Sequence, residues 1–149
     1  MSMQGTVFSR RSFMGGLAAA GAVPLLPGCR SMCAGKGPCS KFGGVQVGVI
    51  TYSYRSMPDK SAEAVLKQVV DSGINSIELM GDVVEKYAGS SLEKVADLRK
   101  MYADAGVGIH IVKFGNIGDK NCTDERIAYY FNVAKALGAK AITREISEE

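Results

Sequence analysis

The chain has 149 residues, of which 46% are hydrophobic and 22% are charged, and it contains no Trp. This composition is typical of a soluble globular protein and excludes collagen, a disordered tail and a membrane bundle. The formal net charge of +3 includes Arg10 and Arg11, so the rest of the chain is almost neutral and gives no reason to expect nucleic acid as a partner.

Residues 1–29 predict an export signal. Arg10 and Arg11 precede an uncharged stretch over residues 14–28, which is too short to span a bilayer comfortably. The order Ser-Arg-Arg-x-Phe over residues 9–13 resembles the twin-arginine signal, although Met14 and Gly15 replace its usual Leu and Lys. We expect export through the Tat machinery to the periplasm or to a lipid anchor at the bacterial envelope. The alternative, an Ala-rich core helix, is disfavoured by the Gly and Pro content of the stretch.

Three cysteines lie near the end of this signal and in the predicted linker, residues 30–44. Cys29 follows Leu26-Pro27-Gly28, a run that resembles the lipobox of bacterial lipoproteins and predicts lipidation of Cys29. The alternative is an ordinary signal cut nearby. Cys33 and Cys39 can form a disulfide in an oxidising compartment or remain thiols of a solvated linker. A metal clip lacks a second Cys-x-x-Cys or a His pair.

Residues 45–149 predict strands that alternate with helices. The β-branched run over residues 45–52 is typical of a strand buried on both faces of a parallel sheet. Further strands are predicted over residues 74–80, 107–114 and 139–146. This order predicts an α/β protein with a parallel sheet.

Three helices are predicted between these strands. The first begins after Ser61, the second at the capping box Ser90-x-x-Glu93, and the third after Thr123. Each ends at a glycine just before the next strand, and these glycines are spaced by 33 and 32 residues: Gly73, Gly106 and Gly138.

This repeat fits a TIM barrel or a doubly wound sheet. No Gly-x-Gly-x-x-Gly follows the first strand, so the dinucleotide-binding alternative loses its main support and the (β/α)8 TIM barrel is favoured. Four strands and three helices are half of such a barrel, which takes about 250 residues. Ser147 is placed to begin a fourth helix. We therefore expect residues 45–149 to be the N-terminal half of a truncated barrel.

The reacting groups of a barrel lie at the C-terminal ends of its strands, where two residues are the candidate catalytic groups. Glu78 lies within an apolar run, and burying its carboxylate without a partner costs several kcal/mol. It is interpreted as a base, a ligand or an acceptor for a sugar hydroxyl, or alternatively as a partner of Lys113 or Arg144. His110, the one histidine, can bind a metal or shuttle a proton. Its alternative is a hydrogen-bonded histidine without chemistry.

Four further residues complete the predicted site. Glu145, on the predicted fourth strand, is a candidate metal ligand, or alternatively an ion-pair partner of neighbouring charges. Tyr52 and Tyr54 are two residues apart and would face the same way on an extended segment, so they are candidates for stacking on a sugar, with core packing as the alternative. Lys113 is a candidate substrate contact.

The segments over residues 47–55 and 73–82 resemble the sugar phosphate isomerase/epimerase family, which has the xylose isomerase-like TIM barrel. The resemblance implies a divalent metal (Mn, Mg, Zn or Co) at the barrel mouth and proton transfer next to a carbonyl of a small sugar substrate. Glu78 and His110 match strand-end positions that line the pocket of such barrels, and Glu145 matches a strand-four acid. Most of the family's metal ligands lie on later strands, so this fragment alone is expected to be inactive.

Two functions of different classes follow. The first is an exported, metal-dependent sugar isomerase or epimerase, of which this chain is the N-terminal part. A lyase or hydrolase of an oxidised sugar would use the same proton abstraction. The second is a non-catalytic lipoprotein whose half-barrel binds sugars or is vestigial. An endonuclease of the same barrel superfamily is disfavoured by the near-neutral charge.

Overall fold

The computed structural model describes residues 37–115 and 122–144. The predicted export signal, with Arg10 and Arg11, the predicted lipidation site Cys29 and the predicted metal ligand Glu145 lie outside these ranges. All the described residues belong to the unit that comprises residues 31–149. Within them, every helix is too short or too polar to cross a membrane.

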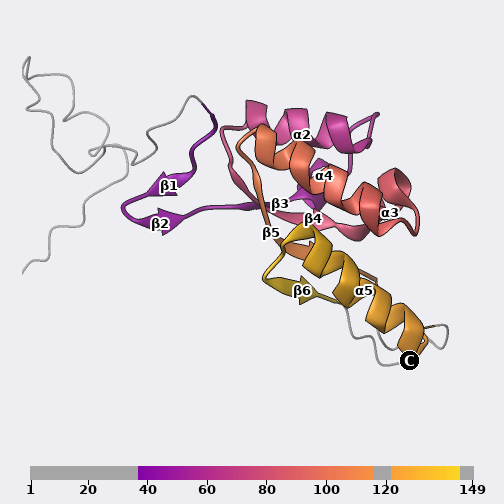
Figure 1. Cartoon of the computed structure of the whole chain (residues 1–149). Coiled ribbons are helices and arrows are strands. Elements are labelled where there is room, and N and C mark those ends of the chain that lie inside the picture. The colour runs from indigo at the N-terminus through magenta and orange to yellow at the C-terminus, as the bar shows by residue number, and fades with distance from the viewer. Residues whose placement is uncertain (1–36, 116–121, 145–149) are drawn as a thin grey trace, which may run out of the picture. The chain divides into compact units, whose positions relative to one another are not determined.

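Four parallel strands form the central sheet in the order in which they occur along the chain (Figure 1). They are β3 (Val49–Ile50), β4 (Ser76–Met80), β5 (Gly108–Lys113) and β6 (Ala141–Thr143). Each neighbouring pair is parallel. The predicted α/β fold class is therefore confirmed, and the sheet has the strand order of one half of a barrel.

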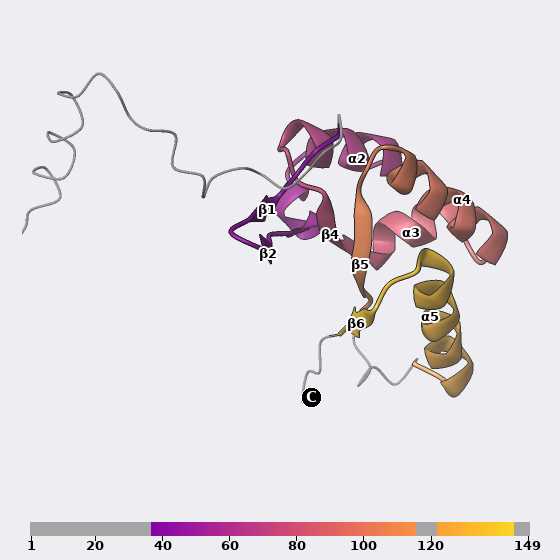
Figure 2. The ribbon, with the colours of Figure 1, turned by 60° about the vertical axis from the view of Figure 1, so that its left-hand side comes forward.

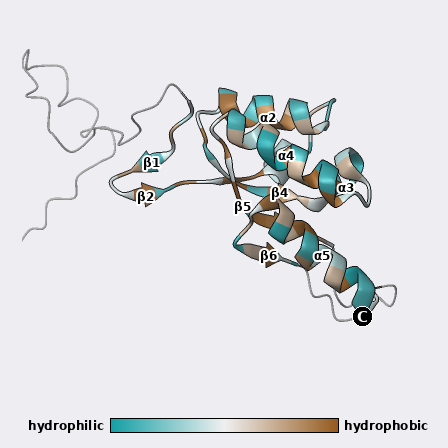
Figure 3. Ribbon diagram, in the orientation of Figure 1, coloured by the Kyte–Doolittle hydropathy of each residue, from teal (hydrophilic) through white to brown (hydrophobic). Residues whose placement is uncertain are grey.

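Four α-helices cover one face of this sheet (Figure 2). They are α2 (Ala62–Asp71), α3 (Gly81–Ala88), α4 (Leu92–Asp104) and α5 (Asp124–Leu137). Figure 3 shows that the helices carry both hydrophilic and hydrophobic residues, which is the pattern of a helix with one covered face. The core lies between helices and sheet, and its fully buried members include Leu79, Leu98 and Val112. The opposite face of the sheet carries no described helix.

The predicted first strand, residues 45–52, differs most from the structure. Val45–Gln46 is strand β2, which pairs antiparallel with β1 (Lys41–Phe42). The hairpin turns at Gly43 and Gly44, both of which have positive φ, a conformation that glycine adopts at no steric cost. Thr51–Tyr54 forms the 3-10 helix η1. Only two residues of the predicted run therefore pair in the parallel sheet.

The hairpin is attached to the sheet through polar side chains. The hydroxyl of Ser40, which has no exposed area, donates to Asn75 Oδ1 at 2.7 Å, and Gln46 Nε2 donates to the same oxygen at 2.9 Å. Asn75 immediately precedes β4. Residues 37–44 are thus not a solvated linker throughout, and Cys39 within them forms a disulfide.

Two predictions about the helices need correction. The second predicted helix is capped by Ser91, whose hydroxyl accepts from the backbone N–H of Lys94, instead of by Ser90. In addition, α3 follows β4 without any loop, and the sequence analysis predicted no helix there. The helix begins at Gly81, where a Cβ atom would lie 2.8 Å from the carbonyl oxygen of Lys113. This close approach of backbone to backbone requires glycine.

Candidate functional site

Glu78 lies near the middle of β4 on the face of the sheet that has no described helix. It is half-buried, whereas its strand neighbours Ile77 and Leu79 are buried in the core. In register with Glu78 on β5 is Ile111, which is also half-buried. We call this side of the sheet, which includes Glu78, Ile111 and Thr143, the inner face, because it corresponds to the inside of a barrel.

The carboxylate of Glu78 has a partner that the sequence analysis missed. The hydroxyl of Thr143 on β6 donates a hydrogen bond to Glu78 Oε1. The bond crosses β5, which lies between the two strands. The sequence offers one signal for Thr143, which is that side chains alternate between the two faces of a strand. Thr143 is in register with Lys113, so both residues lie on the inner face.

A β-bulge separates His110 from Glu78. Ile77 pairs with Ile109 and Glu78 pairs with Ile111, so His110 is the extra residue. A Cβ atom on Gly108 would lie 3.0 Å from His110 Nε2, which shows that the ring lies back over the start of β5. Among the described residues the imidazole has no hydrogen-bond partner. The structure does not bring the two predicted catalytic residues together.

The predicted alternative partner Arg144 does not pair with Glu78. Its Nε donates to the carbonyl oxygen of Gly115 at 2.8 Å, and its guanidinium lies 4.5 Å from the centre of the Tyr130 ring. Arg144 therefore holds the ends of β5 and β6 to α5. Lys113, in contrast, is half-buried on the inner face in register with Met80 and Thr143, close to the row that holds Glu78.

Tyr52 and Tyr54 do not face the same way, because η1 replaces the extended segment on which that prediction rested. Tyr52 is exposed and lies under the guanidinium of Arg55, 4.8 Å from its carbon to the ring centre. The hydroxyl of Tyr54 donates to Ser72 Oγ at 3.3 Å, just beyond α2. The structure therefore does not place the two rings as one stacking surface.

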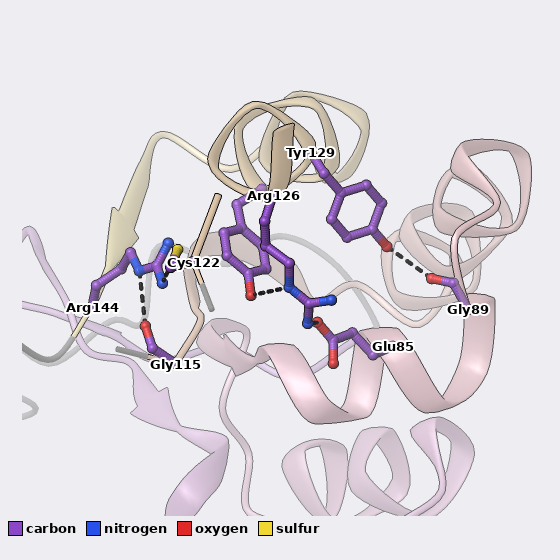
Figure 4. Close-up of polar contacts among 8 residues, drawn as sticks. Glu85, Gly89, Gly115, Cys122, Arg126, Tyr129 and Arg144 are labelled. Carbon is purple, nitrogen blue, oxygen red and sulfur yellow. Dashed lines mark hydrogen bonds and ion pairs between the residues drawn. The ribbon is translucent and has the colours of Figure 1, made fainter. Parts of the chain in front are cut away.

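A second polar cluster lies where α5 meets α3 and the ends of the strands (Figure 4). The ring of Tyr130 stacks on Phe114 with centroids 4.2 Å apart. Arg126 Nε donates to the Tyr130 hydroxyl at 2.8 Å, and its Nη2 forms an ion pair with Glu85 at 3.1 Å. These partners, chiefly the bond to Tyr130, raise the pKa of Arg126. The sequence analysis assigned these residues no contact with one another.

Beside this cluster is an open groove of about 500 Å³ between α5 and the turn that joins α3 to α4. Tyr129 and Gly89 both line this groove, and the Tyr129 hydroxyl donates to the carbonyl oxygen of Gly89 at 2.8 Å (Figure 4). Burial raises the pKa of Tyr129. Glu85 and Arg126, which line the groove, already neutralise each other. The groove lies in the helical layer and has no residue in common with the predicted site.

The described residues do not assemble a metal centre by themselves. No three His, Cys, Asp or Glu side chains converge within residues 37–115 and 122–144. Glu78 is one oxygen donor on the inner face, while His110 is turned toward Gly108. A metal site in this fold would need ligands in addition to these, such as Glu145, which is not among the described residues.

Comparison with known proteins supports the fold. No family model and no curated protein matches the chain. Among solved structures, the fold is similar to that of the probable 3-DHS dehydratase AsbF, involved in petrobactin synthesis, from Bacillus anthracis. The match has a TM-score of 0.52 and 16% identity, and it covers 67% of this chain and 38% of that one.

That dehydratase is a TIM-barrel enzyme. At this identity the likeness concerns the fold alone. It agrees with the predicted barrel type, and this chain spans well under half of the length of the solved structure. The four described parallel strands and their helices are consistent with part of such a barrel.

Proposed function

We propose that this chain belongs to a sugar-processing enzyme in which Glu78 takes a proton from the carbon next to a carbonyl group. The observation that carries the proposal is the position of this carboxylate, half-buried on the inner face of a parallel sheet that resembles part of a xylose isomerase-like barrel. Ligands bind at the inner, C-terminal ends of the strands in this architecture.

The reaction begins with transfer of the proton to Glu78. The electron pair of the broken C–H bond moves toward the carbonyl oxygen and gives an enediolate. Return of the proton to the former carbonyl carbon, with transfer of a hydroxyl proton from one enediolate oxygen to the other, completes an isomerisation. Delivery of a proton to the opposite face of the same carbon by a second acid would complete an epimerisation. Loss of the hydroxyl group from the next carbon as water, with the proton supplied by Glu78, would instead make the reaction a dehydration. The protein side chains that surround the substrate at the strand ends would decide among these outcomes.

One other inner-face residue, Lys113, has a supporting part in this proposal. In this proposal Lys113, which is in register with Met80, would contact an oxygen of the substrate, where its positive charge would stabilise the enediolate. A divalent metal would supply Lewis-acid polarisation of the carbonyl. Because the described residues form no group of three ligands, we derive no step through the metal.

We further propose that Arg10 and Arg11 direct export by the Tat route, with Cys29 as a lipid attachment site.

The test follows proton abstraction itself, which does not require a complete turnover. The 149-residue chain would be incubated in D₂O with aldoses, ketoses, their phosphates and 3-DHS, with and without Mn²⁺, Mg²⁺, Zn²⁺ or Co²⁺. NMR spectroscopy would record deuterium uptake next to the carbonyl. Glu78→Gln is expected to lower the rate of uptake by about 10²–10⁴-fold, the usual contribution of a general base.

The matched control is Glu93→Gln, which removes an exposed carboxylate from the outer surface of α4 and is expected to leave the rate unchanged. Sugar binding that is seen by NMR without any deuterium uptake would favour the non-catalytic, sugar-binding alternative. Uptake that is equal in Glu78→Gln and the wild type would contradict the role of Glu78.

A further inference from the structure

The hydrogen bond between Thr143 and Glu78 joins side chains of two strands that are not neighbours. Thr143 is in register with Lys113 of β5, and Lys113 is in register with Met80 of β4. Glu78 lies two positions before Met80 on the same face of β4. The Thr143 hydroxyl, at the end of β6, thus reaches diagonally over β5 to Oε1 of Glu78, at the middle of β4.

The position of the Thr143 hydroxyl is set by the backbone. A β-branched side chain has few rotamers, and in the one observed here the hydroxyl reaches Glu78. That main chain is held to β5, because the backbone N–H of Phe114 donates to the carbonyl oxygen of Thr143 at 3.1 Å. Immediately after Thr143, Arg144 is bonded to the carbonyl oxygen of Gly115. The hydroxyl is therefore a fixed donor.

Two other described groups that the sequence analysis considered for the site, His110 and Arg144, are directed elsewhere. The bulge turns His110 toward Gly108, and Arg144 contacts Gly115 and the ring of Tyr130. The bond from Thr143 occupies Oε1. A carboxylate that is held through one oxygen cannot rotate freely, and its second oxygen then keeps a defined direction.

We propose that Thr143 is a positioning residue, whose hydroxyl fixes the carboxylate of Glu78 in the orientation needed to take a proton from the substrate. This inference rests on the proposed function for the role of Glu78 as the base. It adds a residue of β6 to the site and explains how one carboxylate on an open face is held. Because general-base catalysis depends first on geometry, loss of the hydroxyl is expected to reduce proton transfer while Glu78 remains in place.

The experiment compares Thr143→Val, which keeps the shape of the side chain but removes the donor, with Thr143→Ser, which keeps the donor. The full chain would be labelled with ¹³C at the glutamate carboxyl carbon, and Glu78→Gln would identify the Glu78 resonance by its absence. Thr143→Val is expected to move this resonance, and Thr143→Ser is expected to restore it. A resonance that stays in place in Thr143→Val, or that moves equally in both variants, overturns the proposal.

Two further measurements separate positioning from folding. Hydrogen exchange of the Phe114 amide, which reports the pairing of β5 with β6, is expected to stay slow in both variants. If Thr143→Val does not fold, the wild type still decides the question. The hydroxyl proton of Thr143 is expected to give a slowly exchanging NMR signal that is absent from Glu78→Ala, and a missing signal in the wild type overturns the proposal.

Deuterium uptake by the sugar then connects the bond to chemistry. Thr143→Val is expected to slow uptake about tenfold, the effect of losing one hydrogen bond to a charged group, and Thr143→Ser is expected to recover most of the wild-type rate. If the wild type takes up no deuterium, the proposed function fails, while the carboxyl resonance still reports on the bond. A moved resonance with an unchanged uptake rate overturns the positioning role alone.

Discussion

Adjacent residues of the same strands have different surroundings on the two faces of the sheet. On the helix-covered face, Leu79 of β4 and Val112 of β5 are fully buried. On the inner face, their neighbours Glu78 and Ile111 are half-buried. Since side chains alternate between the faces of a strand, a single five-residue strand can supply both the core and the candidate site. The core and the candidate site therefore occupy alternate positions of the same strands, so substitutions can address one without the other.

The largest expected effect is the loss of a core side chain. Leu79→Ala should lower the free energy of unfolding by about 2–5 kcal/mol, because it removes apolar burial and leaves a cavity. Ile111→Ala, on the inner face, should lower it by less than half of that amount. Urea unfolding followed by circular dichroism would measure both, and equal losses would show that the inner face is packed as closely as the core.

The next effect concerns the close contact between the start of α3 and the end of β5. Gly81→Ala would place a Cβ atom 2.6 Å from Cδ1 of Phe114 and 2.8 Å from the backbone oxygen of Lys113. Backbone cannot give way as a flexible side chain can, so we expect a loss of about 1–3 kcal/mol in unfolding free energy. Gly115→Ala, where no atom lies within 4 Å, is the matched control. A thermal melt that is identical for both variants would contradict this interpretation.

A smaller effect concerns a polar group inside the core. The buried hydroxyl of Tyr102 donates to the carbonyl oxygen of Ala62 at 2.9 Å, so Tyr102→Phe should cost about 1 kcal/mol. Burial, with a minor contribution from Glu63, raises the pKa of Tyr102 above its ordinary value.

The sign of the pH dependence follows from this shift. An unfolded tyrosine ionises near pH ~10 and the buried one resists ionisation, so its contribution to stability is complete below that pH and declines above it. Denaturant titrations between pH 8 and 11 should show a decline that is less steep in Tyr102→Phe. Tyr52→Phe, at an exposed position, should retain the wild-type slope.

The smallest effect is expected at the outer surface of α2. Lys67 and Asp71 form an exposed i,i+4 ion pair, and such pairs contribute about 0.3–0.5 kcal/mol. Asp71→Asn should therefore lower the melting temperature only slightly, and 1 M salt should remove the difference from the wild type. A loss larger than that of Tyr102→Phe would mean that this surface pair holds α2 in place.

The helices could be predicted well because their signals are local. The hydroxyls of Ser61 and Thr123 accept from the backbone N–H three residues later, as predicted. Gly73 and Gly138 have positive φ at the predicted helix ends. Caps and left-handed glycines act within a few residues of the chain, so sequence spacing is enough to locate them.

The candidate site was harder to predict because its contacts join distant segments. Glu78 was noticed because a carboxylate in an apolar run is costly, but its partner Thr143 is 65 residues away. His110 was assigned to the same pocket because both residues match strand-end positions of the family that the sequence resembles, and the bulge shifts the register between them. A bulge adds one residue without a clear sequence signal.

The sequence by itself determined the alternation of strands and helices, the ends of the main helices and the presence of a carboxylate at a strand that should be apolar. These features follow from local periodicity and from the cost of burying charge. Only the tertiary structure decided that residues 45–46 join a hairpin, that His110 turns away from Glu78 and that Thr143 holds its carboxylate. Those outcomes depend on register and close packing between segments far apart in the chain, which no local pattern encodes.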